Sequence, residues 1–193
     1  MNTTLLSGIL LLILQGAHIW MRSFLVRYKK VVGIVVVTIV GINLLIISGM
    51  YFYLWSNDGG VARYLLPPYH SANYFLFYSL TRVWSPYLIS FALAILWVLV
   101  MRYENKKRGE QFFYPEEYLL ALLSIGIVGW PSVIVFFLMF LIVFMIGSIM
   151  VTVIKGKEAR MSSQYLWIPV ALSVILLQEL VFKGSGIWNL LKI

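Results

Sequence analysis

The sequence contains no cysteine, a single aspartate (Asp58) and few charged residues, which make up 11% of its 193 residues. Without cysteine the chain forms no disulfide, thiolate zinc site, iron–sulfur cluster or thiol nucleophile. Soluble domains are about one quarter charged, so the low charge content excludes a soluble enzyme, a secreted disulfide scaffold and a disordered tail. The signature motifs of phosphate-binding loops, dinucleotide-binding folds, serine hydrolases and zinc peptidases are also missing, and we expect no cofactor and no metal.

Apolar residues dominate what is present: 62% of the chain is hydrophobic, and these residues fall into six runs. A membrane-spanning helix needs about 20 mostly apolar residues. The sequence therefore predicts an all-α, multi-pass integral membrane protein that forms one transmembrane domain over residues 1–193. The predicted spans cover about residues 4–21, 31–55, 83–101, 115–130, 133–154 and 165–182.

Residues 56–82, between the second and third runs, are predicted to form a loop on the outer side of the membrane. The segments 57–60 (Asn-Asp-Gly-Gly) and Pro67-Pro68 are typical of turns. Tyr and Trp side chains favour the depth of the lipid headgroups. We therefore expect the aromatic part, residues 74–80, to lie in the membrane interface.

The basic residues alternate between loops, because eleven of the fifteen Lys and Arg residues follow the first, third and fifth predicted spans. Cytoplasmic loops carry an excess of Lys and Arg, so the pattern predicts odd-numbered loops in the cytosol and both termini outside. No loop is long enough for a nucleic-acid reading surface, and the net charge of +8 instead indicates contact with anionic lipids. The residues expected to make this contact are Arg22, Arg27, Lys29, Lys30, Arg102, Lys106, Lys107 and Arg108.

Polar side chains inside a bilayer are costly, so each is a candidate functional residue. The candidates in the predicted spans are Gln15, His18, Asn43, Glu116, Glu117 and Glu179. Most have a structural interpretation as well. Asn43 can bond a neighbouring helix, Glu179 can pair with Lys183 one turn later, and the adjacent glutamates can favour a helix start.

His18 and Glu117 are predicted at the same depth, on the cytosolic side of the membrane. His18 can also be a neutral interfacial residue. The second histidine, His70, lies in the predicted outer loop. A metal site with two histidine ligands is therefore not expected.

The second half of the chain carries a series of short motifs. Residues 117–123 read Glu-Tyr-Leu-Leu-Ala-Leu-Leu, and residues 129–131 read Gly-Trp-Pro. An apolar run with Gly147, a basic loop and Ile168-Pro169 follow. This order, over about residues 116–180, resembles the type IV prepilin leader peptidases, in which a Gly-x-Gly-Asp motif precedes a Leu/Ala run and a Gly-Trp pair.

The resemblance lacks the catalytic signature of that family, which uses two membrane aspartates. By position, His18 stands at the first aspartate and Glu117 (or Glu116) at the second, residues 113–115 (Phe-Tyr-Pro) replace Gly-x-Gly, and Leu119 stands where a lysine often follows. An aspartyl dyad needs two close carboxyls that share a proton. The resemblance therefore implies a degenerate relative, a pseudoenzyme that still binds an apolar signal helix.

These observations predict a non-catalytic subunit, scaffold or adaptor that acts through other membrane proteins in a bacterial or archaeal cytoplasmic membrane. The resemblance implies a pilus, secretion or conjugation machine. One alternative is a small channel or transporter, because three spans followed by three spans give two halves of opposite orientation. Another is an intramembrane peptidase of altered active site, in which His18 and Glu117 serve as general base and acid.

Overall fold

The computed structural model describes residues 3–57, 61–109, 112–155 and 161–182. Within these ranges every regular element is a helix, and no strand occurs. The α-helices are α1 (Thr3–Trp20), α2 (Arg22–Asn57), α3 (Ala72–Ser79), α4 (Ser85–Lys107), α5 (Glu117–Val128), α6 (Ser132–Lys155) and α7 (Trp167–Leu177). Four short 3₁₀ or π turns join them: η1 (Val61–Leu65), η2 (Leu80–Trp84), η3 (Ser163–Tyr165) and η4 (Gln178–Phe182).

The predicted membrane character is confirmed by helix length and composition. Four helical stretches are long and apolar enough to cross a membrane, namely Arg22–Asn57, Ala72–Lys107, Ser132–Ile154 and Ser163–Leu180. The other two apolar helices, Thr4–Trp20 and Glu117–Val128, are shorter than these. The expected span over residues 115–130 thus becomes a helix of only 12 residues. Gly129 ends it in the left-handed region, with φ +77°, where a residue with a Cβ is strained.

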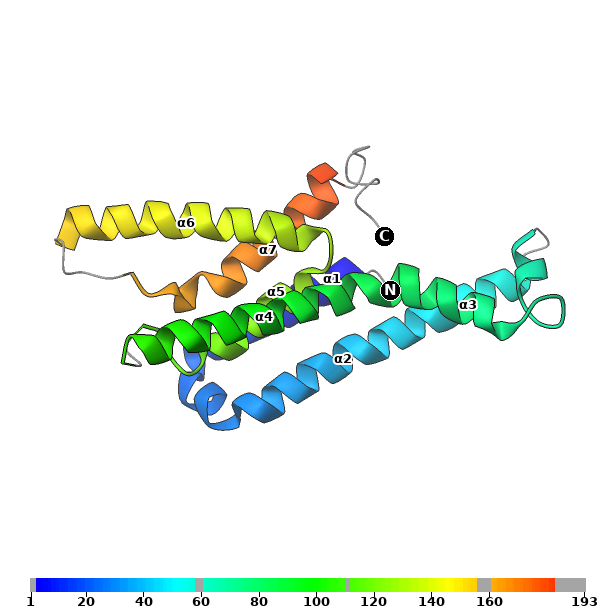
Figure 1. Cartoon of the computed structure of the whole chain (residues 1–193), viewed down its shortest axis with the longest axis horizontal. Coiled ribbons are helices and arrows are strands. Elements are labelled where there is room, and N and C mark those ends of the chain that lie inside the picture. Colours follow the sequence, from blue (N-terminus) through cyan, green and yellow to red (C-terminus); the bar gives the residue numbers. More distant parts are fainter. Residues whose placement is uncertain (1–2, 58–60, 110–111, 156–160, 183–193) are drawn as a thin grey trace.

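Helix α5 is the centre of the bundle (Figure 1). It contacts α1, α2, α4, α6 and α7, and nine of its twelve residues are buried. A helix that is apolar on all sides is stable only when other elements surround it. Gly126 allows α4 to approach closely, because a Cβ at this position would overlap the ring of Phe91.

Aromatic stacking joins α7 to α6 on one side of the core. The buried indole of Trp167 stacks on Phe140, with ring centroids 4.1 Å apart, and on Phe136, at 6.3 Å. Trp97 of α4 contacts Phe137 of α6, with centroids 5.0 Å apart. Aromatic pairs of this kind contribute about 0.5–1.5 kcal/mol beyond the area that they bury. They fix the long outer helices around α5.

The described residues of the stretch 56–82 are mostly helical, whereas the sequence predicts a loop there. The stretch contains η1, and from Ala72 it is helical through α3 and η2 into α4, which gives 36 continuous helical residues. The reason lies in packing against α2: Phe75 and Ser79 are buried there, and Phe75 meets Phe52 at a ring-centroid distance of 5.2 Å. Tertiary contacts thus favour a helix where aromatic composition indicates an interfacial segment.

The outer ends of these two long helices form a projection, the aromatic arm, defined as residues 48–57 and 61–84. Figure 1 shows the arm extending past the ends of the other helices. The Trp55 ring contacts the rings of Tyr78 and Phe75, with centroids at 4.7 and 5.7 Å. At the base of the arm the Ser79 hydroxyl donates to the Ser48 oxygen, with 2.7 Å between the two atoms. The arm is therefore a paired helical hairpin.

Candidate functional site

Polar residues from four elements gather at one end of the bundle, opposite the aromatic arm. We call this group the polar end cluster. It consists of His18 at the end of α1, Arg22 at the start of α2, Glu116 and Glu117 at the start of α5, and Ser163 in η3. The three predicted candidates among them are almost fully buried: His18 is 2%, Glu116 3% and Glu117 1% exposed.

The start of α5 explains why two glutamates lie here. Glu116 is the N-cap of α5, and Glu117 is its first residue. Unpaired N–H groups at a helix N-terminus favour negative charge. Asn105 of α4 holds the preceding loop, because its Oδ1 accepts from the backbone N–H groups of Phe112 and Phe113, both at 2.9 Å. The glutamates are therefore fixed by their own helix and by the neighbouring one.

Glu116 is paired with Arg22. The Arg22 Nε donates to Glu116 Oε1 at 2.7 Å, and the same two side chains form an ion pair. The Glu116 side chain is 4% exposed and the Arg22 side chain 45%. A buried carboxylate without a partner is strongly destabilising, so this contact compensates its charge. It also ties the start of α2 to the start of α5.

Glu117 is held by hydrogen bonds. Its Oε2 accepts from the Ser163 hydroxyl at 2.5 Å, and its Oε1 accepts from the Tyr114 backbone N–H at 3.4 Å. Neither ion pair found among the described residues includes Glu117. Since Ser163 begins η3, the turn that leads into α7, this contact joins the start of α5 to the start of α7.

His18 lies in the same cluster without a hydrogen bond of its own. Neither ring nitrogen has a partner within the described ranges. The imidazole packs against the ring of Tyr165, with 5.6 Å between centroids, and interacts electrostatically with Glu116. The structure thus brings His18 and Glu117 to the same end of the bundle, but it bonds Glu117 to Ser163 rather than to the imidazole.

The other predicted candidates lie elsewhere. Gln15 is half-buried on α1, and Asn43 is buried in α2, where its Oδ1 has no partner among the described residues. Glu179 lies in η4, and its Oε1 accepts from the Thr4 hydroxyl at 2.5 Å. Its predicted partner, Lys183, lies outside the described residues. Among the described residues no three His, Cys, Asp or Glu side chains lie close enough to hold a metal ion.

The sequence reasoning missed three members of this end of the bundle. The sequence places Arg22 at the lipid surface, although it follows His18 by only four residues, across the short connection between α1 and α2. Ser163 sits in a polar stretch that carries no signal for a buried role. Asn105 lies in a hydrophilic segment after a predicted span, where an exposed side chain is expected, yet it is only 7% exposed. Only the fold reveals these partners.

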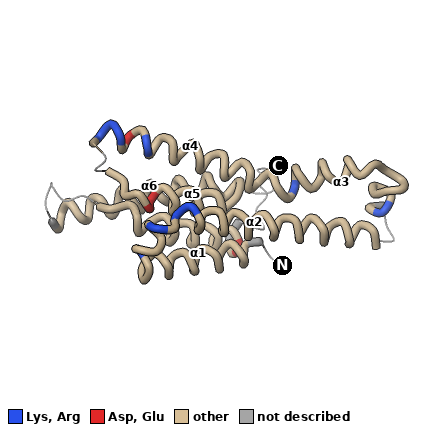
Figure 2. Tube along the Cα trace, turned by 90° about the horizontal axis from the view of Figure 1, so that it is seen from below, with Lys and Arg blue, Asp and Glu red and all other residues tan. Residues whose placement is uncertain are grey.

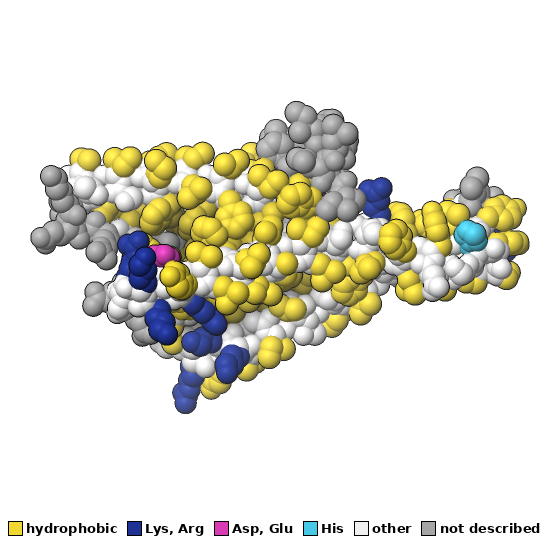
Figure 3. Space-filling view, viewed as in Figure 1, with side chains coloured by type: hydrophobic (Ala, Val, Ile, Leu, Met, Phe, Trp, Pro, Cys, Tyr) yellow, Lys and Arg dark blue, Asp and Glu magenta, His cyan; other side chains and the backbone are white. Residues whose placement is uncertain are grey.

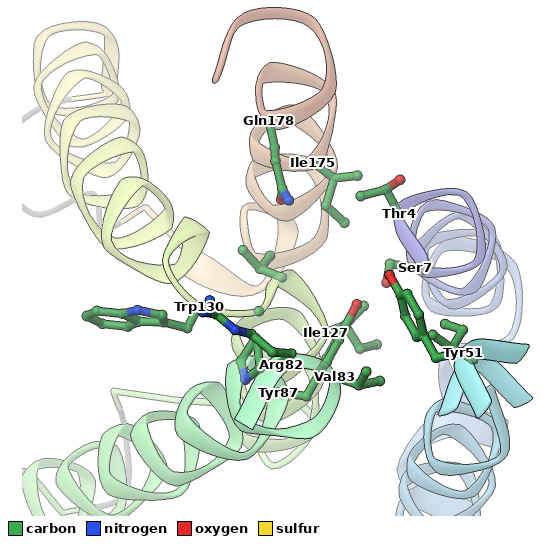
Figure 4. Close-up of a pocket in the computed structure, with 14 residues that line it drawn as sticks. Thr4, Ser7, Tyr51, Arg82, Val83, Tyr87, Ile127, Trp130, Ile175 and Gln178 are labelled. Carbon is green, nitrogen blue, oxygen red and sulfur yellow. The ribbon is translucent and has the colours of Figure 1, made fainter. Parts of the chain in front are cut away.

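A second polar region lies at the opposite end, where a cavity of about 280 Å³ opens near the base of the arm (Figure 4). Both π turns border it: η2 contributes Arg82 and η4 contributes Gln178. The amide oxygen of Gln178 accepts from the Ser132 hydroxyl at 2.6 Å. Thr4 and Tyr51 also line this space. Such a lining can hydrogen-bond a small polar or anionic group.

Comparison with known proteins adds no relative. No family model matches this sequence, and no curated protein or solved structure is similar to it. The resemblance to the prepilin peptidases therefore stays a prediction. The function has to be inferred from the helices, the polar end cluster and the surfaces of the chain itself.

Proposed function

We propose that this chain is a multi-pass membrane protein without catalytic activity, which serves as a subunit or adaptor of a larger membrane assembly. The aromatic arm is the observation that carries the proposal, because it extends past the other helices and exposes large apolar side chains. In this proposal all six apolar helices α1, α2, α4, α5, α6 and α7 lie at membrane depth. Helix α5 is short, but neighbouring helices enclose it, and irregular backbone at membrane depth is tolerated where protein surrounds it.

The distribution of charge supports an orientation. Lys29 and Lys30 near the start of α2 lie at the same end of the bundle as Arg102, Lys106 and Lys107 near the end of α4. Figure 2 shows most of the Lys and Arg positions on the Cα trace at this end, and Figure 3 shows most of the visible Lys and Arg side chains there, opposite the arm. By the positive-inside rule, the polar end cluster faces the cytosol, and the arm and both termini lie outside.

Helix length supports a role for the arm outside the hydrocarbon. A helix rises 1.5 Å per residue, so the 36 residues from Ala72 to Lys107 extend over roughly 50 Å. The hydrocarbon core is only about 30 Å thick. Tyr53 and Phe77 on the arm are both 68% exposed, and Tyr64 is 60% exposed. Exposed apolar surface outside the hydrocarbon marks a site of protein or membrane interaction.

The state of the glutamates supports a structural role for the polar end cluster. Glu116 is paired with Arg22, and Glu117 is bonded to Ser163. Both contacts join helix ends that lie far apart in the sequence. The two glutamates thus connect α5 to α2 and to the turn before α7, which supports a structural role at the place of the second catalytic aspartate of the prepilin peptidases.

Site-specific photocrosslinking in the native membrane tests the proposal. A photoreactive amino acid at Phe77 or Tyr53 should give one discrete protein adduct, and the same protein should co-purify at fixed stoichiometry after gentle detergent extraction. Leu141 on α6, which is 51% exposed and faces lipid in this orientation, is the matched control and should give no protein adduct. Arm positions that behave like Leu141, in a chain that purifies alone, would contradict the proposal.

One observation favours a second candidate, an intramembrane peptidase of altered active site. His18 has two ring nitrogens without hydrogen-bond partners among the described residues, and it shares the cluster with both glutamates. Incubation of the purified chain with pilin-like precursors, followed by mass spectrometry of the products, tests this function. Cleavage that disappears in both His18→Ala and Glu117→Gln supports it, and absence of cleavage by the unaltered chain excludes it for these substrates.

A further inference from the structure

A groove on the side of the bundle has an apolar floor and a basic end. It has a volume of about 560 Å³ and lies between α2, α4 and α5. Val37 on α2, Val98 on α4 and Leu122 on α5 contribute apolar side chains. Lys29, Lys30 and Arg102 line the same groove.

The three cations lie at one end of the groove. Lys29 and Lys30 precede Gly33 by about one turn of α2, and Arg102 follows Val98 by about one turn of α4. All three cations are exposed. The Arg102 guanidinium lies over the Tyr118 ring, 5.5 Å from its centroid, which holds it at the groove.

No negative charge within the described part of the chain balances this end of the groove. The described lining includes no acidic residue, and the two ion pairs found there use Arg22 and Arg108 instead. Eight basic residues are expected to contact anionic lipid. Lys29, Lys30 and Arg102 differ from the other five because they line a concave surface together with apolar side chains. A ligand that fits this surface is negative at one end and apolar along its length.

A partner's transmembrane helix fits this surface less well than a lipid does. Helices associate in membranes where small residues let two backbones approach closely. Gly33 is the only glycine in the described lining, and a Cβ added to it would already lie 3.1 Å from the Leu119 Cδ1 atom. The Leu119 side chain of α5 thus already occupies the space next to Gly33. Flexible acyl chains adapt to such a shallow, closed floor.

We propose that this groove is a specific binding site for an anionic phospholipid of the cytosolic leaflet. The phosphate group is bound between Lys29, Lys30 and Arg102, and an acyl chain lies along Val37 and Leu122. The lipid bridges α2 to α4 and α5. This inference goes beyond the proposed role as a subunit, because it requires no protein partner.

Native mass spectrometry of the full chain in detergent tests the site. Dioleoyl phosphatidylglycerol is titrated against dioleoyl phosphatidylcholine, which has the same chains and no net charge. We expect one retained phosphatidylglycerol and no phosphatidylcholine at the same concentration. The double variant Lys29→Gln/Lys30→Gln should weaken phosphatidylglycerol binding about 25-fold, since each lysine near a membrane surface contributes about 5-fold.

Two matched controls separate a site from general attraction. The variant Lys106→Gln/Lys107→Gln removes the same charge at the same end of the bundle, from residues that do not line the groove, and should change the affinity less than about 3-fold. Val37→Trp should fill the groove and abolish retention. Val35→Trp, at a valine outside the lining that is 49% exposed against 44% for Val37, should leave retention unchanged.

Three results would overturn the inference. Equal loss in the two double-lysine variants would show diffuse surface attraction. Unchanged retention in Val37→Trp, or in Val37→Phe if the tryptophan variant does not purify as a folded chain, would show that no acyl chain occupies the groove. Equal binding of inorganic phosphate and phosphatidylglycerol would show that only a phosphate group is recognised.

Discussion

Removing the guanidinium that faces Glu116 tests whether the polar end cluster fastens the bundle. In Arg22→Ala the Glu116 carboxylate, 4% exposed, loses its cation and the donor at 2.7 Å. Breaking a fully buried pair costs about 3–5 kcal/mol, and an exposed pair contributes about 0–1 kcal/mol. The Arg22 side chain is 45% exposed, so we expect the free energy of unfolding to fall by about 2 kcal/mol, between these limits.

A double-mutant cycle isolates the pair. Arg22→Ala, Glu116→Gln and the double variant are unfolded in mixed micelles by increasing the fraction of a denaturing detergent, with tryptophan fluorescence as the signal. The double variant should regain most of the lost stability, because a neutral amide no longer needs a cation. The coupling energy should be about 1–2 kcal/mol, as is usual for residues in contact.

An exposed pair provides the control for this cycle. Glu104 in the last turn of α4 and Arg108, the C-cap of that helix, are four residues apart. Their Oε2 and Nε atoms are 3.4 Å apart, and the side chains of Arg108 and Glu104 are 57% and 37% exposed. Their coupling energy should stay below about 0.5 kcal/mol. The reasoning fails if Arg22 and Glu116 couple no more strongly than this exposed pair.

Two further changes test the packing around α5. Ser163→Ala removes the donor to the buried Glu117 carboxylate and should lower the free energy of unfolding by about 1–3 kcal/mol, whereas Ser163→Thr keeps a hydroxyl and should recover part of it. Gly126→Ala places a methyl group into the ring of Phe91 and should cost about 1–3 kcal/mol. Gly41→Ala on α2, with open space around its Cα, should be neutral or stabilising by up to about 1 kcal/mol; equal losses in the two glycine variants would contradict the close approach of α4 to α5.

The sequence predicted the helical membrane class correctly because that signal is local. Long apolar runs such as residues 133–154 and 31–55 need no tertiary information to be recognised as helices. The continuous helix that begins at Ala72 could not be predicted in this way. It depends on Phe75 meeting Phe52, which lies in a different helix, and a single aromatic-rich stretch does not reveal such a partner.

The candidate site was also predictable only where the signal is local in the sequence. Hydropathy and charge were enough to propose that His18 and Glu117 lie at one end of the bundle, because both flank predicted spans on the same side. The partners of the glutamates were not predictable, since Arg22 and Ser163 are joined to them only by the fold. Sequence patterns identify which side chains are costly in a membrane, but the structure decides what compensates each cost.

The shortness of α5 has a consequence for how the chain enters a membrane. Its 12 residues extend over only about 18 Å, and its first residue is a glutamate, so α5 is a poor substrate for independent insertion. Only three residues, Gly129 to Pro131, separate it from α6, whose 24 residues are strongly apolar. In the proposed topology α5 and α6 therefore insert into the bilayer together, driven by the apolar α6. Helix α5 then packs against α1, α4 and α7 once these helices have inserted.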